Sequence, residues 1–129
     1  MNMTISRWLA ASLLPFLAGM ATCMATESGQ VYVWGNNTCN EVANGNTNPG
    51  VYAPELVQTP DLITQAHVGS ISQDRGRIVT VTARSEVIGW GDNTSGALAS
   101  STPAKIPTPT KILDRADILS VASGSEFTL

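Results

Sequence analysis

The side chains that could carry chemistry are few and scattered along the chain. His67 is the sole histidine, and a metal site or a catalytic triad needs partners for it at a spacing that the sequence does not supply. Asp114 and Asp117 lie close together, but in a stretch typical of a turn rather than of two acids facing each other across a cleft. No phosphate-binding glycine loop, Cys-x-x-Cys or Gly-x-Ser-x-Gly motif is present. We therefore expect no enzyme activity, catalytic residue, cofactor or metal ion.

Cys39 is the one remaining side chain with a special chemistry. The other cysteine, Cys23, falls in a segment that we expect to be removed, so no internal disulfide can form. An exposed lone thiol in an exported protein could pair with another chain, which makes Cys39 a candidate intermolecular thiol. The alternative is a small buried side chain with no reactive role.

The first 25 residues have the three-part pattern of a secretory signal peptide. A weakly positive head ending at Arg7 precedes the apolar run Trp8–Ala21, and small residues follow up to Ala25. The run is shorter than the ~20 residues of a spanning helix, and Pro15 interrupts it. We predict a cleaved signal helix and a secreted, periplasmic or cell-surface protein without membrane association after cleavage. An uncleaved anchor is the alternative.

Composition limits the partners of residues 26–129. Charged residues make up 13% of the chain, and 11 glycines and 7 prolines predict many turns. Without Arg7, acidic side chains outnumber basic ones, which argues against binding to a nucleic-acid backbone. The closest basic group is Arg75, Arg77 and Arg84, which we interpret as a solvated hairpin edge.

An internal repeat is the strongest signal in the sequence. Trp34-Gly35 recurs 56 positions later as Trp90-Gly91. The same offset, without a gap, aligns Val31 with Val87, Asn37 with Asn93, Thr38 with Thr94, Asp61 with Asp117 and Ala66 with Ala122. A register of this length indicates a duplicated structural unit.

The residue composition of each unit is typical of short β-strands. Arg77–Thr82 is the clearest, because four of its six residues are β-branched. Further strands are expected at 30–34, 62–68, 86–90 and 118–122, with loops at 45–50 and 103–109. Units of roughly 40 to 60 residues with several short strands are typical of propeller blades. The prediction is an all-β, partial β-propeller of about two blades, with repeats at 29–84 and 85–129, the second incomplete.

The repeat core resembles that of the regulator of chromosome condensation family, in a secreted bacterial-type member. Its Val-x-x-Trp-Gly-x-Asn core starts at Val31 and again at Val87, and a degraded Gly-Gln-Leu-Gly stretch follows as 40–43 and 96–99. The structural core residues are Val31, Trp34, Gly35, Asn37, Val87, Trp90, Gly91, Asn93, Gly96 and Gly124.

The core residues carry specific structural expectations. Both tryptophans should anchor the core between strands or blades. The glycines after them permit a positive φ, and Asn40 tolerates the left-handed region. Ala43 and Ala99, where the repeat pattern has glycine, should mark a changed turn.

The resemblance implies a protein-binding module rather than an enzyme. Some secreted bacterial relatives in this family inhibit enzymes such as β-lactamases, so partner recognition or inhibition through the loops 38–52 and 94–109 is the leading hypothesis. Guanine-nucleotide exchange on a small GTPase, the activity of the family's namesake, and a structural cell-surface module are the alternatives. The family closes its ring with about seven repeats, so we predict a truncated product, completed by further blades or self-assembly.

Overall fold

Six antiparallel strands form the protein in a computed structural model that describes residues 29–72, 74–101 and 103–129. The predicted signal peptide at 1–25 lies outside the described residues. The strands are β1 (Tyr32–Asn36), β2 (Gly50–Leu56), β3 (Ile63–Ser72), β4 (Arg75–Thr82), β5 (Val87–Asp92) and β6 (Lys105–Leu113). The described residues contain no helix, so the all-β prediction is confirmed. Among them, no helix has the length and apolarity needed to span a membrane.

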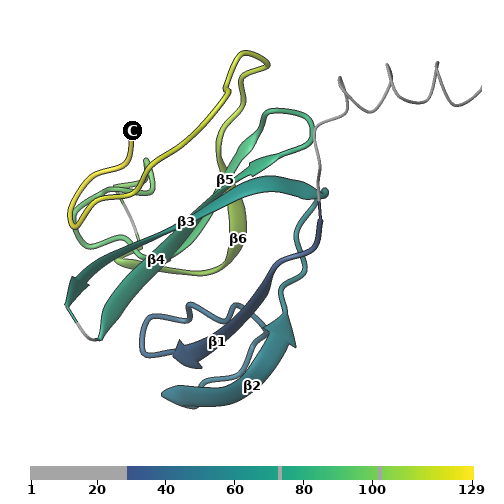
Figure 1. Ribbon diagram of the computed structural model, residues 1–129. Coiled ribbons are helices and arrows are strands. Elements are labelled where there is room, and N and C mark those ends of the chain that lie inside the picture. Colours follow the sequence, from purple (N-terminus) through teal and green to yellow (C-terminus); the bar gives the residue numbers. More distant parts are fainter. Residues whose placement is uncertain (1–28, 73, 102) are drawn as a thin grey trace, which may run out of the picture.

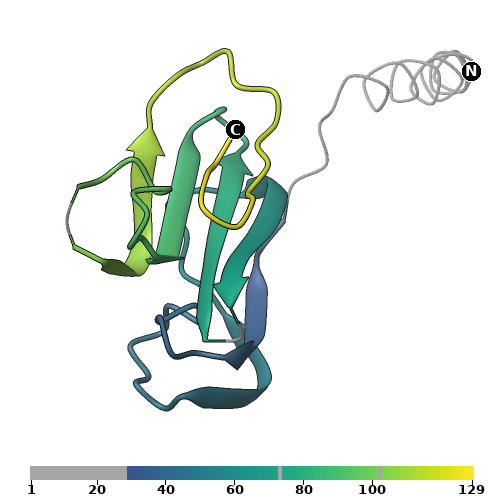
Figure 2. The same ribbon diagram turned by 90° about the vertical axis from the view of Figure 1, so that its left-hand side faces the viewer.

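The strands form one four-stranded and one two-stranded sheet (Figures 1 and 2). The larger sheet is a meander in the order β3-β4-β5-β6, which is the form of a propeller blade. Its middle strands are covered on both faces: every residue of β5, and every residue of β4 from Arg77 onward, is buried. The outer strands β3 and β6 are mostly exposed or half-buried, and only Ile63, Gly69 and Ile106 are buried in them.

The four-stranded sheet is out of phase with the sequence repeat. The blade takes β3 and β4 from the first unit and β5 and β6 from the second, so the boundary at 84/85 falls inside it. The small sheet β1-β2 is the first unit's counterpart of β5-β6. The two repeats therefore make one complete blade and half of another, rather than two whole blades.

The register shows that the 56-residue offset is not free of gaps. Asn36 lies opposite Gly50, whereas its counterpart Asp92 lies opposite Lys105. The connecting loop is thus one residue longer in the first unit (37–49 against 93–104). A register shift after Val87 in β5-β6 restores the offset.

Three segments differ from the strand prediction. Residues 50–56, for which no strand was expected, form β2. Residues 105–109, expected in a loop, open β6 because they pair with β5. Residues 118–122, expected as a strand, form none. The end of the chain folds on itself instead, through the bridge between Ser123 and Thr128. A strand needs a neighbouring strand for its backbone groups, and Ala122 instead exchanges its backbone hydrogen bonds with Leu129 in the same turn.

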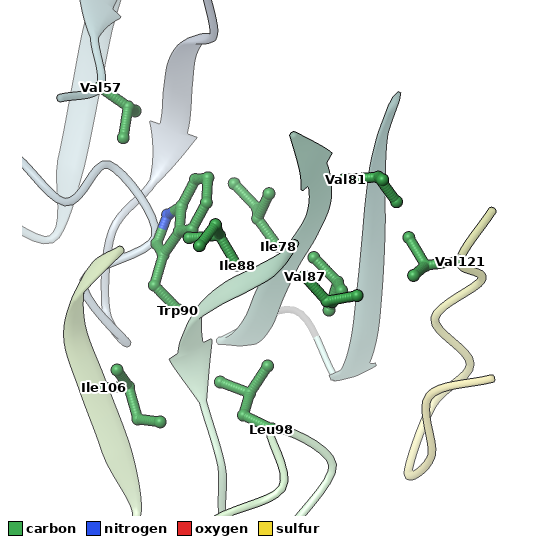
Figure 3. Close-up of a cluster of buried hydrophobic side chains, with 10 residues drawn as sticks. Val57, Ile78, Val81, Val87, Ile88, Trp90, Leu98, Ile106 and Val121 are labelled. Carbon is green, nitrogen blue, oxygen red and sulfur yellow. The ribbon is translucent and has the colours of Figure 1, made fainter. Parts of the chain in front are cut away.

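The core lies on both faces of the blade. On one face Ile78, Ile88 and Trp90 point toward β1-β2, where Val57 meets them (Figure 3). On the other face Val81 and Val87 lie beside the C-terminal segment that carries Val121 (Figure 3). The four-stranded blade is thus packed between the two-stranded sheet β1-β2, which we call the half-blade, and the C-terminal segment.

Candidate protein-binding face

Buried asparagines organise the loop that follows β1 and the loop that follows β5. The Asn37 side-chain amide donates to the carbonyl oxygens of Asn46 (2.8 Å) and Asn48 (3.0 Å), and its Oδ1 accepts from the Val42 amide (3.0 Å). Three hydrogen bonds from one buried side chain hold the loop 37–49 to a single shape.

Asn93 repeats this arrangement in the second unit. Its side-chain amide donates to the carbonyl oxygens of Ser100 (2.9 Å) and Pro103 (3.0 Å), and its Oδ1 accepts from the Leu98 amide (3.0 Å). Asn37 and Asn93 are 3% and 4% exposed. Both predicted core asparagines are therefore structural, and the loop 93–104 is built like the loop 37–49.

The glycines that follow the two tryptophans have the expected backbone. Gly35 has φ of 110° and Gly91 has φ of 99°, values that suit glycine alone. At Gly91 a side chain is also excluded by contact, since a Cβ would lie 2.5 Å from the Gly76 carbonyl oxygen. The blade thus needs a glycine at this point for two reasons.

The turn after each asparagine is the same in both units, contrary to the expectation of a changed turn. Asn40 and Gly96 are left-handed, with φ of 64° and 71°. Ala43 and Ala99 also have positive φ, 52° and 53°, and each amide donates to the carbonyl three residues earlier at 3.1 Å. The hydrogen-bonded loop holds alanine in a conformation that glycine adopts more easily.

The last core glycine, Gly124, allows the end of the chain to fold back. A Cβ there would lie 2.7 Å from the Phe127 ring, and the Gly124 amide donates to the Phe127 carbonyl at 2.9 Å. Gly124 therefore lies in the short C-terminal turn rather than in a strand.

The first loop is held against strands β4 and β6 of the blade. Lys105 Nζ donates to the Thr38 carbonyl at 2.9 Å, and the Glu41 carboxylate accepts from the amides of Gly76 (3.0 Å) and Cys39 (2.8 Å). Figure 2 shows both loops at the lower ends of their strands. We call the described residues of 37–49 and 93–104 the loop face.

Polar, uncharged side chains dominate the exposed part of the loop face. Exposed positions include Thr38, Asn44, Thr47, Asn48, Thr94, Ser95 and Ser101. One ion pair, between Arg75 and Asp92 (3.2 Å), lies at the base of the second loop, whereas Arg84 meets Asp61 (2.9 Å) and Lys111 meets Glu86 (2.7 Å) at the other end of the strands. There the hydrogen bond to Glu86 raises the pKa of Lys111. The exposed residues of the loop face therefore offer mainly hydrogen-bonding groups, while exposed charges are more frequent at the other end.

Arg77 is buried, contrary to its interpretation as part of a solvated edge. It is 1% exposed and donates to the carbonyls of Gly124 (3.2 Å) and Ser125 (2.9 Å). Burial lowers the pKa of its guanidinium. Arg77 thus ties the blade to the C-terminal segment. Only Arg84 of the three arginines is mainly solvated, with its side chain 74% exposed.

Asp92 is a buried carboxylate that the sequence did not reveal. It accepts from Thr94 Oγ1 (2.7 Å) and Arg75 Nε (3.2 Å). Burial opposes its ionisation, but these hydrogen bonds outweigh that cost and lower the pKa of Asp92. Its counterpart in the other unit is Asn36, so the repeat carried no signal for a charge here.

Cys39 does not fit a role as an intermolecular thiol. It is 1% exposed, and its Sγ lies 3.4 Å from the Asp74 carbonyl oxygen. Burial, reinforced by the nearby Glu41 carboxylate, raises the pKa of the thiol. An inaccessible protonated thiol is a poor nucleophile, so the alternative of a small buried side chain is the correct one.

The tryptophans behave differently from each other. Trp90 is fully buried and its indole donates to the Glu41 carbonyl at 2.7 Å, as expected of a core anchor. Trp34 is 59% exposed, so its prediction as a core anchor is wrong. The preceding valines follow the same pattern, because Val87 is buried and Val31 is half-buried.

His67, Asp114 and Asp117, the remaining side chains with possible catalytic chemistry, are exposed, and the histidine lies on a different segment from the two aspartates. His67 lies on the outer strand β3 opposite Val79, and Asp114 and Asp117 lie in the segment after β6. Asp117 binds Arg115 at 2.8 Å, which lowers its pKa. Within the described ranges, no group of three or more His, Cys, Asp or Glu side chains is placed to hold a metal ion.

Comparison with known proteins places these features among repeat proteins. A family model described as "Regulator of chromosome condensation (RCC1) repeat" matches residues 85–129, and a second model with the same description matches residues 21–41. Mouse (Mus musculus) Alsin is 28% identical over 101 residues, which cover 78% of this chain and 6% of Alsin. The crystal structure of human WBSCR16 has a TM-score of 0.58 at 19% identity, over 73% of this chain and 24% of that one. The chain thus spans a small part of either protein, and the likeness to WBSCR16 concerns the fold.

Proposed function

The chain belongs to the regulator of chromosome condensation repeat family, and we propose that it acts by binding a protein partner through its loop face, without catalysis of its own. Proteins built from these repeats form β-propellers. Rigid sheets that display loops at one end are a common way to build a recognition surface.

One observation carries the proposal: two loops of the same design follow strands β1 and β5, each fixed by a buried asparagine. Because Asn37 and Asn93 already order the loops, a partner would meet a surface whose conformational entropy has been lost before binding. The exposed Asn, Ser and Thr side chains offer adaptable hydrogen bonds, a chemistry that antibody loops also use. Few charges stand on this face, which favours a protein surface over a polyanion as its partner.

We further propose that the protein is exported and that its partner is an enzyme, which it inhibits. Export rests on the signal-like segment 1–25, and inhibition rests on the family resemblance together with two protruding loops that could enter a substrate cleft. The partner would then be found in the periplasm, at the cell surface or outside the cell.

Matched arginine variants test which end of the molecule binds. Thr47→Arg with Ser101→Arg adds two positive charges to the loop face, while Ala83→Arg with Ala116→Arg adds the same charges at the opposite end; all four positions are exposed. The full chain would be titrated against a panel of secreted hydrolases, β-lactamases included, with inhibition and calorimetry as readouts. The loop-face variant should weaken binding at least about 10-fold because rim charges oppose docking, and the control should bind normally.

Equal loss of binding in both variants would reject the loop face as the binding surface. The alternative of nucleotide exchange has its own readout, the release of a fluorescent guanine nucleotide from small GTPases. Acceleration by the full chain, abolished in the loop-face variant, would replace inhibition with exchange as the function of this face.

A further inference from the structure

At the contact between the half-blade and the blade, one large side chain, the knob, packs into a recess on the other sheet, the socket. The knob is Trp90 on β5. The socket is the turn at 39–43 together with Val57, which Figure 3 shows on the side of the blade where Trp90 lies. The Trp90 indole donates to the Glu41 carbonyl in this turn. Cys39, Glu41 and Val57 are 1%, 7% and 2% exposed, because the blade covers them.

The second unit has the same socket, but it is open. The counterparts of Cys39, Glu41 and Val57 are Ser95, Ala97 and Leu113, and Leu113 is 43% exposed. These residues line a mainly apolar pocket of about 410 Å³, which also includes Ala99, Ile112 and Phe127. The matching backbone of the two turns keeps the Ala97 carbonyl in the position that Glu41 has in the first unit.

The first unit has the same knob, and it too is open. Trp34 is the counterpart of Trp90 and is 59% exposed, and Tyr32, the counterpart of the buried Ile88, is 52% exposed. Exposed aromatic side chains on one strand face are unusual in a monomer and typical of an interface. One chain therefore carries an open knob at one end and an open socket at the other.

We infer that two copies of this chain associate head to tail, with Trp34 of one copy in the pocket around Ala97 of the next. The indole N–H donates to the Ala97 carbonyl, as Trp90 donates to Glu41 within the chain. The partner is a second copy because the two complementary halves are the two halves of an interface that this chain already makes once. The contact is heterologous, so each copy can bind a neighbour on both sides. Its socket includes Ser95, Ala97 and Ala99 of the loop face, but sedimentation of the chain alone involves no enzyme, so a failure of this inference and a failure of the proposed function are distinguishable.

Sedimentation of the full chain and its variants tests the inference. The wild-type chain should show mass rising with concentration between about 1 µM and about 1 mM, the range of weak specific contacts. Trp34→Ala removes the knob and should raise the dissociation constant at least about 30-fold, as expected for an interface tryptophan. Leu113→Glu puts a charge in the socket and should act equally. Tyr52→Ala, a control on the same sheet at a 98% exposed residue, should associate normally.

Mixing the two variants gives the sharper result. Trp34→Ala keeps its socket and Leu113→Glu keeps its knob, so each should be monomeric alone, while an equimolar mixture should form a 1:1 dimer that cannot grow. If Leu113→Glu does not fold, by circular dichroism, Ala97→Glu replaces it. A wild-type chain that stays monomeric to about 1 mM would overturn the inference and leave another protein or further blades as the occupant. Self-association that survives Trp34→Ala, or a mixture that stays monomeric, would overturn it as well.

Discussion

Strands β1 and β5 share one sequence motif but lie in opposite surroundings. Both carry a Trp-Gly pair with a positive φ at the glycine, and both lead into a loop held by a buried asparagine. Yet β5 is buried along its whole length, whereas four of the five residues of β1 are exposed. The difference teaches that the motif determines the local backbone, while the sheet that lies against it determines whether the motif is core or surface.

The largest expected effect contrasts the two tryptophans. Trp90→Ala should destabilise the protein by about 3–5 kcal/mol, since it leaves a large cavity and removes the donor to the Glu41 carbonyl. Trp34→Ala should change stability by less than about 0.5 kcal/mol, as is usual for exposed positions. Urea unfolding at concentrations where the chain is monomeric measures both. Similar costs would mean that β1 is covered in solution.

The paired glycines give the next contrast. Gly91→Ala should cost about 3 kcal/mol, because the new Cβ meets the backbone of Gly76 and Arg77 in addition to the strain of a positive φ. Gly35→Ala meets nothing within 4 Å and should cost only the strain, about 1–2 kcal/mol. Thermal unfolding of the two variants compares them. A Gly35 variant as unstable as the Gly91 variant would contradict the open environment of β1.

The loop asparagines should show no contrast. Asn37→Ala and Asn93→Ala each leave a buried amide, that of Val42 or of Leu98, without its acceptor, at a cost of about 2 kcal/mol. Hydrogen exchange should speed up in the loop of the altered unit alone. If the two variants differed by more than about 1 kcal/mol, the loops would not be equivalent anchors.

Acid dependence is the smallest effect expected. The pKa of Asp92 is lowered on folding, so its contribution to stability is full above the unfolded value of about 3.9 and is lost as pH falls through the folded pKa. Asp92→Asn should cost about 1 kcal/mol at pH 7 and flatten the loss of stability in acid, while Glu55→Gln should leave that profile unchanged. Parallel acid profiles for Asp92→Asn and the wild-type chain would show that the carboxylate is not stabilised in the fold.

Short-range features were the most predictable from sequence. The strand at 77–82, the positive φ of Gly35 and Gly91 and the duplicated unit all follow from residues close together in the chain. The turns at Ala43 and Ala99 were mispredicted because the asparagine-anchored loop, with a hydrogen bond from each alanine amide to the carbonyl three residues earlier, holds alanine where glycine is easier. The strand expected at 118–122 failed because β-pairing depends on a neighbour, not on the strand's own composition.

The sequence by itself determined that this protein is built from a repeated β unit with a Trp-Gly core and an asparagine-anchored loop, since those features depend on backbone preferences of nearby residues. Only the tertiary structure decided that the blade crosses the repeat boundary, that Arg77, Asp92 and Cys39 are buried, and that Trp90 is core while Trp34 is surface. Burial depends on which segment lies opposite, and segments brought together by folding leave no local trace in the residues they cover.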